Sequence, residues 1–440
     1  MVGAGRVAYA RFQTVTKRAG PPTLWALASV AAVGLAYKRY HSALAGRVGH
    51  DFSFYMRAGV AVAHGHSPYR VADYVYPPFI ATLLAPFSHV DIHTVWKVWT
   101  AGACGALVVV ALLVVLAVGR ALSQIERPVL FGIAGVSALH FWPTTVLLEL
   151  GQADTFVLAL LALSVLASER GRSKLAGVFL GLAGLAKAWP GAAVVAFFRK
   201  HYQRRWPTLI AFVITVALAP VLALALGGAS ELSQLFRAIF NARSQHLVSD
   251  SVWGIPSLNF SHSGLAHPLF VSLPLQVVAT VALLGWVVTL MIVTLHTDVS
   301  DPVLPFWNVV LCVVVLLPVS HLAYAIMGLP LLWSWIGKLM ERSRSSAPSR
   351  AEGRWRRPEG MVVAVTAILV LWWVILNKTW PDNGSSAAIS SLRYSVVFGA
   401  NLVAVTASVF GVVWLGRHSP TATVDTVPSV VTAPAVALPG

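Results

Sequence analysis

Long apolar stretches recur along this chain, and short polar segments separate them. An α-helix needs about 20 apolar residues to cross the roughly 30 Å hydrocarbon core of a bilayer, and several stretches reach this length. In lipid, each backbone N–H and C=O group must be bonded within the protein, which a helix achieves internally. We therefore predict an all-α, polytopic integral membrane protein surrounded by membrane lipids.

The composition supports this class and argues against others. Of the 440 residues, 57% are hydrophobic and only 11% are charged, which is too apolar for a soluble domain. The net charge is +16, but the Lys and Arg residues stand between apolar stretches and not among exposed aromatic residues. We therefore expect basic cytoplasmic helix ends and no nucleic-acid partner. Cys104 and Cys312 lie inside apolar stretches and indicate neither a disulfide framework nor a cysteine metal site.

The positive charges also suggest an orientation. Residues 1–21 form a basic N-terminus that we place in the cytoplasm, and 22–418 form a transmembrane domain. The tail 419–440 is rich in Pro, Ala, Thr and Val without periodicity, and we expect it to be disordered. We predict about twelve transmembrane helices, with both termini cytoplasmic, near 22–38, 92–118, 129–148, 152–168, 175–186, 188–198, 207–227, 273–296, 303–319, 321–338, 360–376 and 396–416.

The stretches 175–186 and 188–198 need separate treatment, because each is too short to cross a bilayer alone. Basic residues flank the pair on both sides, so both flanks should be cytoplasmic. The pair is then either two crossings or a re-entrant hairpin, and the chain reverses at the turn that begins with Lys187.

Two segments, 39–91 and 228–272, are long enough to build structure on the outer face. In the first, hydrophobic residues recur at helical spacing, which predicts an interfacial amphipathic helix over 51–64 that ends at Gly65. Prolines directly before 79–87 predict a second short helix there.

Five ionisable residues fall at outward ends or turns: Asp51, Glu149, Asp154, Lys187 and His321. Charged groups are costly at membrane depth, so these are the natural candidates for function. Asp51 is placed to act as a general base for a sugar hydroxyl, or alternatively to cap its helix. The neighbouring His50 either orients this carboxylate or only reaches toward the interface.

Lys187 and His321 are candidates for binding an anion. Small residues surround Lys187 at its turn, which suits a phosphate headgroup; the alternative is a lysine that extends to the interface. His321, with Tyr324 one helical step away, could donate to a phosphate or serve only a structural role. We expect Asp154 to cap the helix that follows it. In the second outward segment, groups of the kind that bind sugars and phosphates are Arg237, Arg243, His246, Asp250, Trp253, Asn259 and His262.

Several common motifs are missing. The sequence has no Asp-x-Asp, no His-Glu-x-x-His, no Walker lysine loop and no Rossmann glycine fingerprint. Neither a metal-bound nucleotide-sugar donor nor an ATP-driven pump is indicated. We expect no metal and no cofactor.

Taken together, the motifs resemble those of the C superfamily of glycosyltransferases, in the family 87 branch that contains mycobacterial polyprenyl-phosphate-mannose-dependent α-mannosyltransferases. The resemblance covers roughly residues 45–335. The motifs that carry it are Asp51-Phe-Ser-Phe-Tyr, Gly65-His-Ser-Pro-Tyr69, Tyr76-Pro-Pro-Phe79, Gly151-Gln152, Gly181-Leu-Ala-Gly-Leu-Ala-Lys187-Ala-Trp-Pro190 and Pro318-Val-Ser-His321-Leu-Ala-Tyr324.

The resemblance implies an inverting transfer of a sugar, with mannose as the first choice, from polyprenyl phosphate to a glycolipid or lipoglycan on the outer face of the plasma membrane. It implies that Asp51 is the catalytic base, that Lys187 and His321 contact the donor phosphate, and that Tyr76 and Gln152 line the site. We add four residues as candidates for substrate binding: Tyr55, Tyr324, His246 and Trp253. The same chemistry with arabinofuranose, galactosamine or glucose is one alternative. A transporter or flippase of lipid-linked sugars is another, and a non-catalytic envelope scaffold is a third.

Overall fold

The computed structural model describes residues 2–72, 74–199, 202–240, 249–262, 268–299, 301–318, 320–345, 357–378 and 387–418. Within these ranges the regular elements are all helices, joined by turns and loops, without a strand. The all-α class is therefore confirmed. Within these ranges, four helices and one pair of consecutive helices are long and apolar enough to cross a membrane alone: Ile92–Ala121, Leu273–His296, Glu359–Asn377, Arg393–His418 and the continuous stretch Arg205–Arg237. The chain is thus a polytopic membrane protein, while the total of about twelve helices stays a prediction.

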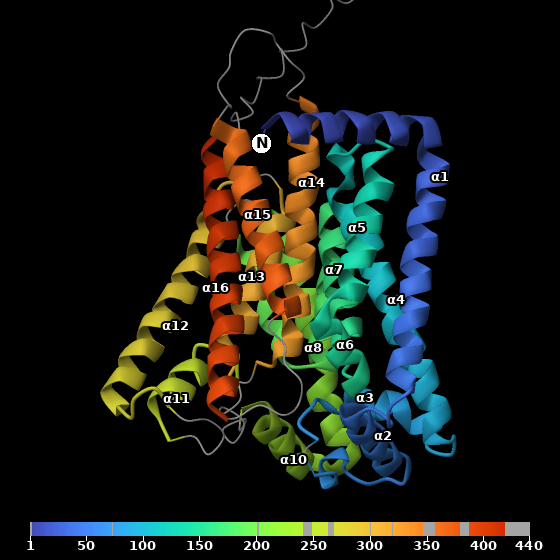
Figure 1. Ribbon diagram of the computed structural model, residues 1–440. Helices are drawn as coiled ribbons and strands as arrows, with labels where there is room; N and C mark the ends of the chain where they lie inside the picture. The colour runs from blue at the N-terminus through green and yellow to red at the C-terminus, as the bar shows by residue number, and fades with distance from the viewer. Residues whose placement is uncertain are drawn as a thin grey trace, which may run out of the picture.

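The helices form an upright bundle with short helices gathered at its lower end in Figure 1. The N-terminal part of α1 (Val2–Leu44) lies across the upper end, because the helix bends at Gly20, where φ is +72°. The bundle then contains α4 (Ile92–Val118), α5 (Glu126–His140), α7 (Asp154–Glu169), α9 (Arg205–Val216), α12 (Leu273–His296), α15 (Arg357–Lys378) and α16 (Ala387–His418). The remaining elements are α2 (His50–Ala63), η1 (Pro68–Arg70), α3 (Pro78–Leu84), η2 (Ala85–Phe87), η3 (Gly119–Ala121), α6 (Trp142–Leu150), α8 (Ser173–Ala186), η4 (Trp189–Phe198), α10 (Leu218–Phe240), α11 (Gly254–Phe260), α13 (Val303–Leu316), η6 (Leu322–Gly328) and α14 (Leu329–Ser345).

The two short helices predicted after the first span are present. The helix expected over 51–64 is α2, and Gly65 follows it with φ of +73°. The helix expected over 79–87 begins at Pro78 as α3 and continues as η2. Both lie at the lower end of the bundle (Figure 1).

The segment 175–198 forms a hairpin and returns to the end of the bundle at which it entered. Helix α8 has 14 residues and η4 has 10, so each is only about 20 Å long. Glu169 at the end of α7 and Arg199 after η4 interact electrostatically, which places both ends of the hairpin together. This geometry fits both alternatives from the sequence, two short crossings or a re-entrant hairpin, and it places Lys187 at the tip.

Helix α13, η6 and α14 form a second hairpin of similar design. Helix α13 has 14 residues and ends at Leu316, and the chain reverses before η6. The sequence predicted one regular helix over 321–338, which is wrong in its first part, because residues Leu322–Gly328 form a 3₁₀-helix.

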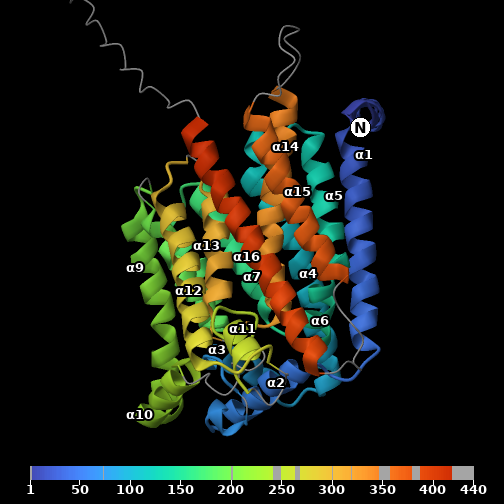
Figure 2. The ribbon, with the colours of Figure 1, turned by 60° about the vertical axis from the view of Figure 1, so that its left-hand side comes forward.

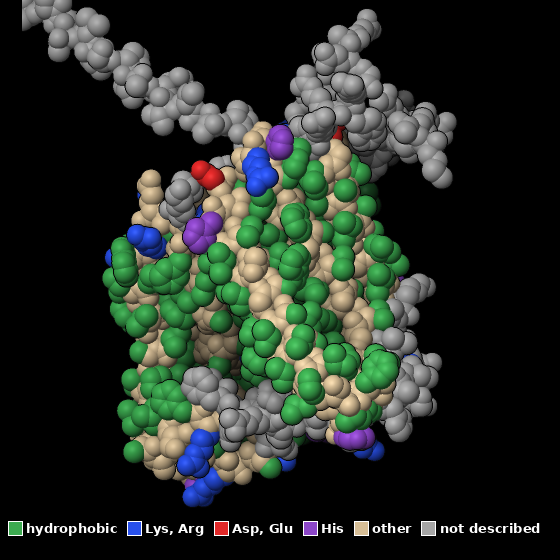
Figure 3. Space-filling view, turned by 90° about the vertical axis from the view of Figure 1, so that its left-hand side faces the viewer, with side chains coloured by type: hydrophobic (Ala, Val, Ile, Leu, Met, Phe, Trp, Pro, Cys, Tyr) green, Lys and Arg blue, Asp and Glu red, His purple; other side chains and the backbone are tan. Residues whose placement is uncertain are grey.

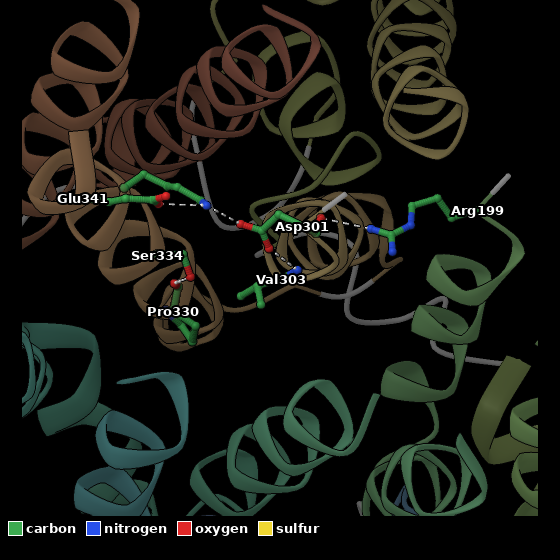
Figure 4. A network of polar contacts seen from close by, with 7 residues as sticks. Arg199, Asp301, Val303, Pro330, Ser334 and Glu341 are labelled. Carbon is green, nitrogen blue, oxygen red and sulfur yellow. Dashed lines mark hydrogen bonds and ion pairs between the residues drawn. The ribbon is translucent and has the colours of Figure 1, made fainter. Parts of the chain in front are cut away.

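A polar network ties the two hairpins together at the end of the bundle away from their tips (Figure 4). The Lys338 ammonium pairs with the carboxylates of Asp301, at 3.0 Å, and Glu341, at 3.1 Å. Asp301 also accepts a hydrogen bond from the Val303 amide at 2.8 Å, and its carbonyl accepts one from Arg199 at 3.1 Å. The end of η4, the start of α13 and the body of α14 are thus held in one cluster, which fixes the bases of both hairpins.

Two other predicted spans differ from the structure. The span expected over 129–148 is bent by 59° between α5 and α6, since Pro143 in the first turn of α6 cannot continue the helical hydrogen bonds of α5. The span expected to end at 227 continues as α10 to Phe240, with a kink at Gly227 and Gly228. The second outward segment therefore starts with the end of α10.

Glycines in α8 allow unusually close packing against α9. A Cβ atom on Gly177 would lie 2.1 Å from the Thr208 carbonyl oxygen, and one on Gly181 would lie 2.6 Å from the Thr215 Cβ. These glycines therefore serve close contact between α8 and α9.

We expect Gly177→Ala to lower the free energy of unfolding by about 1–3 kcal/mol, because the added methyl group overlaps backbone that cannot move away. Thermal unfolding of the purified protein in detergent measures this. Gly105→Ala is the matched control, since a Cβ there meets nothing within 4 Å. Equal stability of both variants and the parent protein would contradict the packing argument.

The surface of α9, α10 and α12 is strongly apolar. Figure 3 shows this face covered by hydrophobic side chains, with a hollow between the column of α9 and α10 and that of α12. The two columns pack on different partners, α9 on α8 and η4, and α12 on α13 and α16. Figure 2 shows α12 beside α13 and α16. Exposed side chains on these columns include Val213, Ile214, Val221, Val277, Val278 and Val281.

Candidate functional site

The tips of the two hairpins meet around one buried ammonium group. Lys187 follows the last residue of α8 and is only 2% exposed. Its Nζ donates a hydrogen bond to the hydroxyl of Tyr324, in η6, at 3.2 Å. The ring of Trp189, just past the first tip, lies 5.8 Å from that of Tyr324. Residues 137 positions apart in sequence thus form one contact.

The counter-ion of Lys187 is Asp154. Nζ of Lys187 lies 2.6 Å from Oδ2 of Asp154, whose side chain is fully buried. Buried charges are tolerated only in such close, hydrogen-bonded pairs. The expectation that Asp154 caps α7 is wrong, because the helix has no side-chain cap and the carboxylate is used by Lys187. The alternative of a lysine extending to the interface is also wrong, since Lys187 is buried.

Aromatic rings enclose the ammonium group. The Lys187 Nζ lies 4.8 Å from the ring centre of Tyr324 and 5.4 Å from that of Tyr76, within range of a cation–π attraction. The ring of Tyr55 contacts that of Tyr76 edge-on at 4.9 Å. Burial raises the pKa of the Tyr76 phenol, although the Lys187 ammonium opposes this, so Tyr76 is a neutral hydroxyl at pH 7.

Asp51 lies in the first turn of α2, beside this cluster. It interacts electrostatically with Lys187, Asp154 and His321, which come from three other parts of the chain. The residue before the helix is Gly49, and α2 has no side-chain cap, so the alternative of Asp51 as an N-cap is wrong. Among the described residues the Asp51 side chain has no hydrogen bond and no ion pair, and it is only partly buried. Its carboxylate is therefore available to a substrate.

Two glycines set the position of Asp51. A Cβ on Gly49 would lie 2.7 Å from the Leu150 carbonyl group, and one on Gly151 would lie 2.6 Å from the Phe52 Cβ. Gly151 also has φ of +72°, which glycine adopts without strain. The start of α2 therefore packs directly on the turn that leads into Asp154.

His321 forms the second hairpin tip. Its ring lies 5.7 Å from that of Tyr324. Burial lowers the pKa of His321, and the nearby Lys187 ammonium lowers it further. The imidazole is therefore neutral near pH 7 and can donate one hydrogen bond without adding a second positive charge.

A short segment within the second outward region supports this tip. The Ser320 amide donates to the Ser249 hydroxyl at 2.7 Å, and the Asp250 amide donates to the Ser320 carbonyl at 2.9 Å. Trp253 donates from its indole N–H to the Leu316 carbonyl at 2.9 Å, which satisfies a free carbonyl at the end of α13. Trp253 thus supports the tip from outside the cluster, and its role in substrate binding stays a prediction.

The other sequence candidates differ in where the structure places them. Gln152 is buried two residues before Asp154, and its Oε1 has no partner. Glu149 is exposed and interacts with Arg39 of α1, so it lies away from the cluster. His50 stacks edge-on against Phe54 at 4.7 Å. His246 lies outside the described residues, as does the tail 419–440.

The site also contains residues that the sequence did not single out. Trp189 and the Ser249 hydroxyl were missed, since an aromatic residue in an apolar stretch and a loop serine carry no specific signal. Among the described residues, no three His, Cys, Asp or Glu side chains gather as a metal site would require. The groups at hand are one buried ammonium, one neutral imidazole, several phenols and one unpaired carboxylate.

A comparison with known proteins supports a family assignment. Residues 74–321 match the model of glycosyltransferase family 87. The matched region includes Tyr76, Gln152, Lys187 and His321, and it begins after Asp51 and Tyr55. No curated protein matches the chain.

Proposed function

Since this chain belongs to glycosyltransferase family 87, whose model matches more than half of its residues, we propose that it transfers a sugar from polyprenyl phosphate to a lipid-bound acceptor. Mannose is the first choice of sugar, and the acceptor is a hydroxyl of a glycolipid or lipoglycan. The observation that carries the proposal is the buried Lys187, reached by both hairpin tips, with the unpaired Asp51 carboxylate beside it.

In the proposed mechanism, Asp51 accepts the proton of the acceptor hydroxyl as its oxygen attacks the anomeric carbon. The new glycosidic bond forms on the face opposite the phosphate, the bond from that carbon to the phosphate oxygen breaks, and the configuration inverts. The donor is a phosphodiester with one negative charge, and the leaving polyprenyl phosphate gains a second. The Lys187 ammonium therefore stabilises the transition state more than the bound donor, and His321 donates a hydrogen bond to the same phosphate.

The apolar hollow in Figure 3 is a suitable place for the polyprenyl chain. It opens between α9 and α10 on one side and α12 on the other, where hydrophobic side chains face the lipid. A polyprenyl chain lying there would pass from the hydrocarbon core of the bilayer into the protein without crossing a polar surface. Its phosphate would then be placed toward the hairpin tips.

We place the site on the outer face of the plasma membrane and both termini in the cytoplasm. The end of the bundle away from the hairpin tips carries many basic residues, including Arg120, Arg172, Arg199 and Arg344, and such residues concentrate on the cytoplasmic side. The N-terminal part of α1 lies at that same end (Figure 1).

The decisive experiment uses the purified full chain in liposomes with polyprenyl phosphate [¹⁴C]mannose and an extract of envelope glycolipids. We expect label in a new glycolipid with an inverted anomeric linkage. Movement of the donor between leaflets without a new glycosidic bond would instead support the flippase alternative. Donors that carry arabinofuranose, galactosamine or glucose, assayed in parallel, rank the candidate sugars.

A further inference from the structure

Several buried polar atoms around Lys187 have no hydrogen-bond partner. Asp154 Oδ1 and Gln152 Oε1 are acceptors without a donor, and the Trp189 indole N–H is unused as a donor. Buried polar groups are almost always paired, because leaving one unpaired costs its whole hydration. Acceptors and donors that gather around one cation therefore indicate a polar ligand with hydroxyl groups.

Asp154 is the most informative of these residues, because its two oxygens have different surroundings. Oδ2 is held by Lys187 at 2.6 Å, so the side chain cannot rotate without breaking a buried ion pair. Oδ1 is fixed by this contact and remains unpaired in a side chain with no exposed surface.

The chemistry of Oδ1 narrows the ligand. An ionised carboxylate oxygen only accepts hydrogen bonds, so it repels a phosphate, which at neutral pH also only accepts. A sugar hydroxyl, in contrast, can donate to it. A sugar attached to a phosphate that contacts Lys187 would lie within a few bonds of that ammonium. Oδ1 is also close to the ammonium, because it shares a carboxylate with Oδ2, which lies 2.6 Å from the Lys187 Nζ.

We propose that Asp154 determines donor specificity by accepting a hydrogen bond from one hydroxyl of the donor sugar through Oδ1, while Oδ2 positions Lys187. This inference rests on the proposed function, because it takes the lipid-linked sugar as the ligand. A site that binds one hydroxyl discriminates strongly against the sugar that lacks it, since the carboxylate oxygen would then stay buried and unpaired.

The test compares the parent donor with analogues that each lack one sugar hydroxyl. Binding of each to the purified full chain is measured at equilibrium, and transfer is measured separately. In the parent protein one analogue should bind about 10–100-fold more weakly than the complete donor, as expected for losing one hydrogen bond to a charged group. We call the loss of affinity caused by removing one hydroxyl the deoxy penalty of that analogue. In Asp154→Asn, which keeps the size of the side chain, the deoxy penalty of this analogue should shrink at least several-fold. The deoxy penalties of the other analogues should stay the same.

Thr155→Val is the matched control. Thr155 is the next residue on α7, is fully buried and has an unpaired hydroxyl, so its loss changes the same turn without touching Lys187. This variant should keep every deoxy penalty of the parent protein. Should Asp154→Asn fold poorly, Asp154→Glu provides the second test. It keeps the charge but displaces the carboxylate by one methylene group, which should change which analogue binds more weakly.

The two measurements separate the two hypotheses. Deoxy penalties that are the same in the parent protein and in both Asp154 variants would overturn the specificity role, whether or not transfer occurs. In the other outcome, the parent protein transfers no sugar, but the binding measurements show a deoxy penalty that depends on Asp154. This would overturn the proposed transferase function and leave the specificity role of Asp154 standing.

Discussion

Replacing Asp51 by asparagine should lower the rate of sugar transfer by about 10²–10⁴-fold, the usual contribution of a general base. The amide has the size of the carboxylate but cannot take up a proton at neutral pH. Asp51 has no hydrogen bond or ion pair among the described residues and does not cap α2, so we expect little change in stability. Initial rates with saturating donor, together with equilibrium binding of the donor, measure the effect.

The control is Asp91→Asn. Asp91 is a carboxylate in the same loop region that caps α4 by accepting from the Thr94 amide at 3.0 Å, and asparagine caps helices equally well. This variant should transfer sugar at the parent rate. Full activity of Asp51→Asn would contradict the assignment of the base, and a loss confined to donor binding would move Asp51 to a binding role.

The sequence predicted those parts of the site that depend on local pattern. Helical spacing of apolar residues placed Asp51 at the start of an amphipathic helix, and basic flanks placed Lys187 at a turn. Both predictions rest on sequence patterns close to the residue in question, namely apolar periodicity next to Asp51 and basic residues flanking the hairpin of Lys187. The structure agrees, since α2 begins at His50 and Lys187 follows α8.

The ion pair between Asp154 and Lys187 was beyond such reasoning. A carboxylate after a glycine turn at the start of a helix has the pattern of a cap, and its actual partner lies 33 positions away. The pairing exists because α7 and α8 pack side by side and the hairpin tip returns to the start of α7. Similarly, Leu322–Gly328 is apolar enough to look like an ordinary helix, and its 3₁₀ form follows from the hairpin that contains it.

The second large effect concerns the pair itself. We expect Lys187→Met to lower transfer by about 10²–10³-fold, because the charge that forms on the leaving phosphate loses its buried cation. The same variant should also lose about 3–5 kcal/mol of stability, since the Asp154 carboxylate would stay buried without its partner. Loss of activity in this variant alone would therefore have two possible causes, phosphate binding and folding.

The double variant Lys187→Met with Asp154→Asn separates the two causes. Removing both charges leaves a neutral, buried pair, which should recover most of the stability, as replacement of buried ion pairs often does. Because the cation for the phosphate is still missing, transfer should stay as low as in Lys187→Met. Thermal unfolding and initial rates on the same preparations measure both quantities.

Lys338→Met is the control for this pair of measurements. Lys338 pairs with Asp301 and Glu341 at the opposite end of the hairpins, so its loss should lower stability while the folded protein keeps its rate of transfer. Recovery of transfer together with stability in the double variant would show that Lys187 only balances Asp154, and the phosphate would then need another cation. Protein that is stable but stays inactive at saturating donor, where the weaker donor binding expected from the loss of Asp154 no longer limits the rate, would instead assign the ammonium of Lys187 to the donor phosphate.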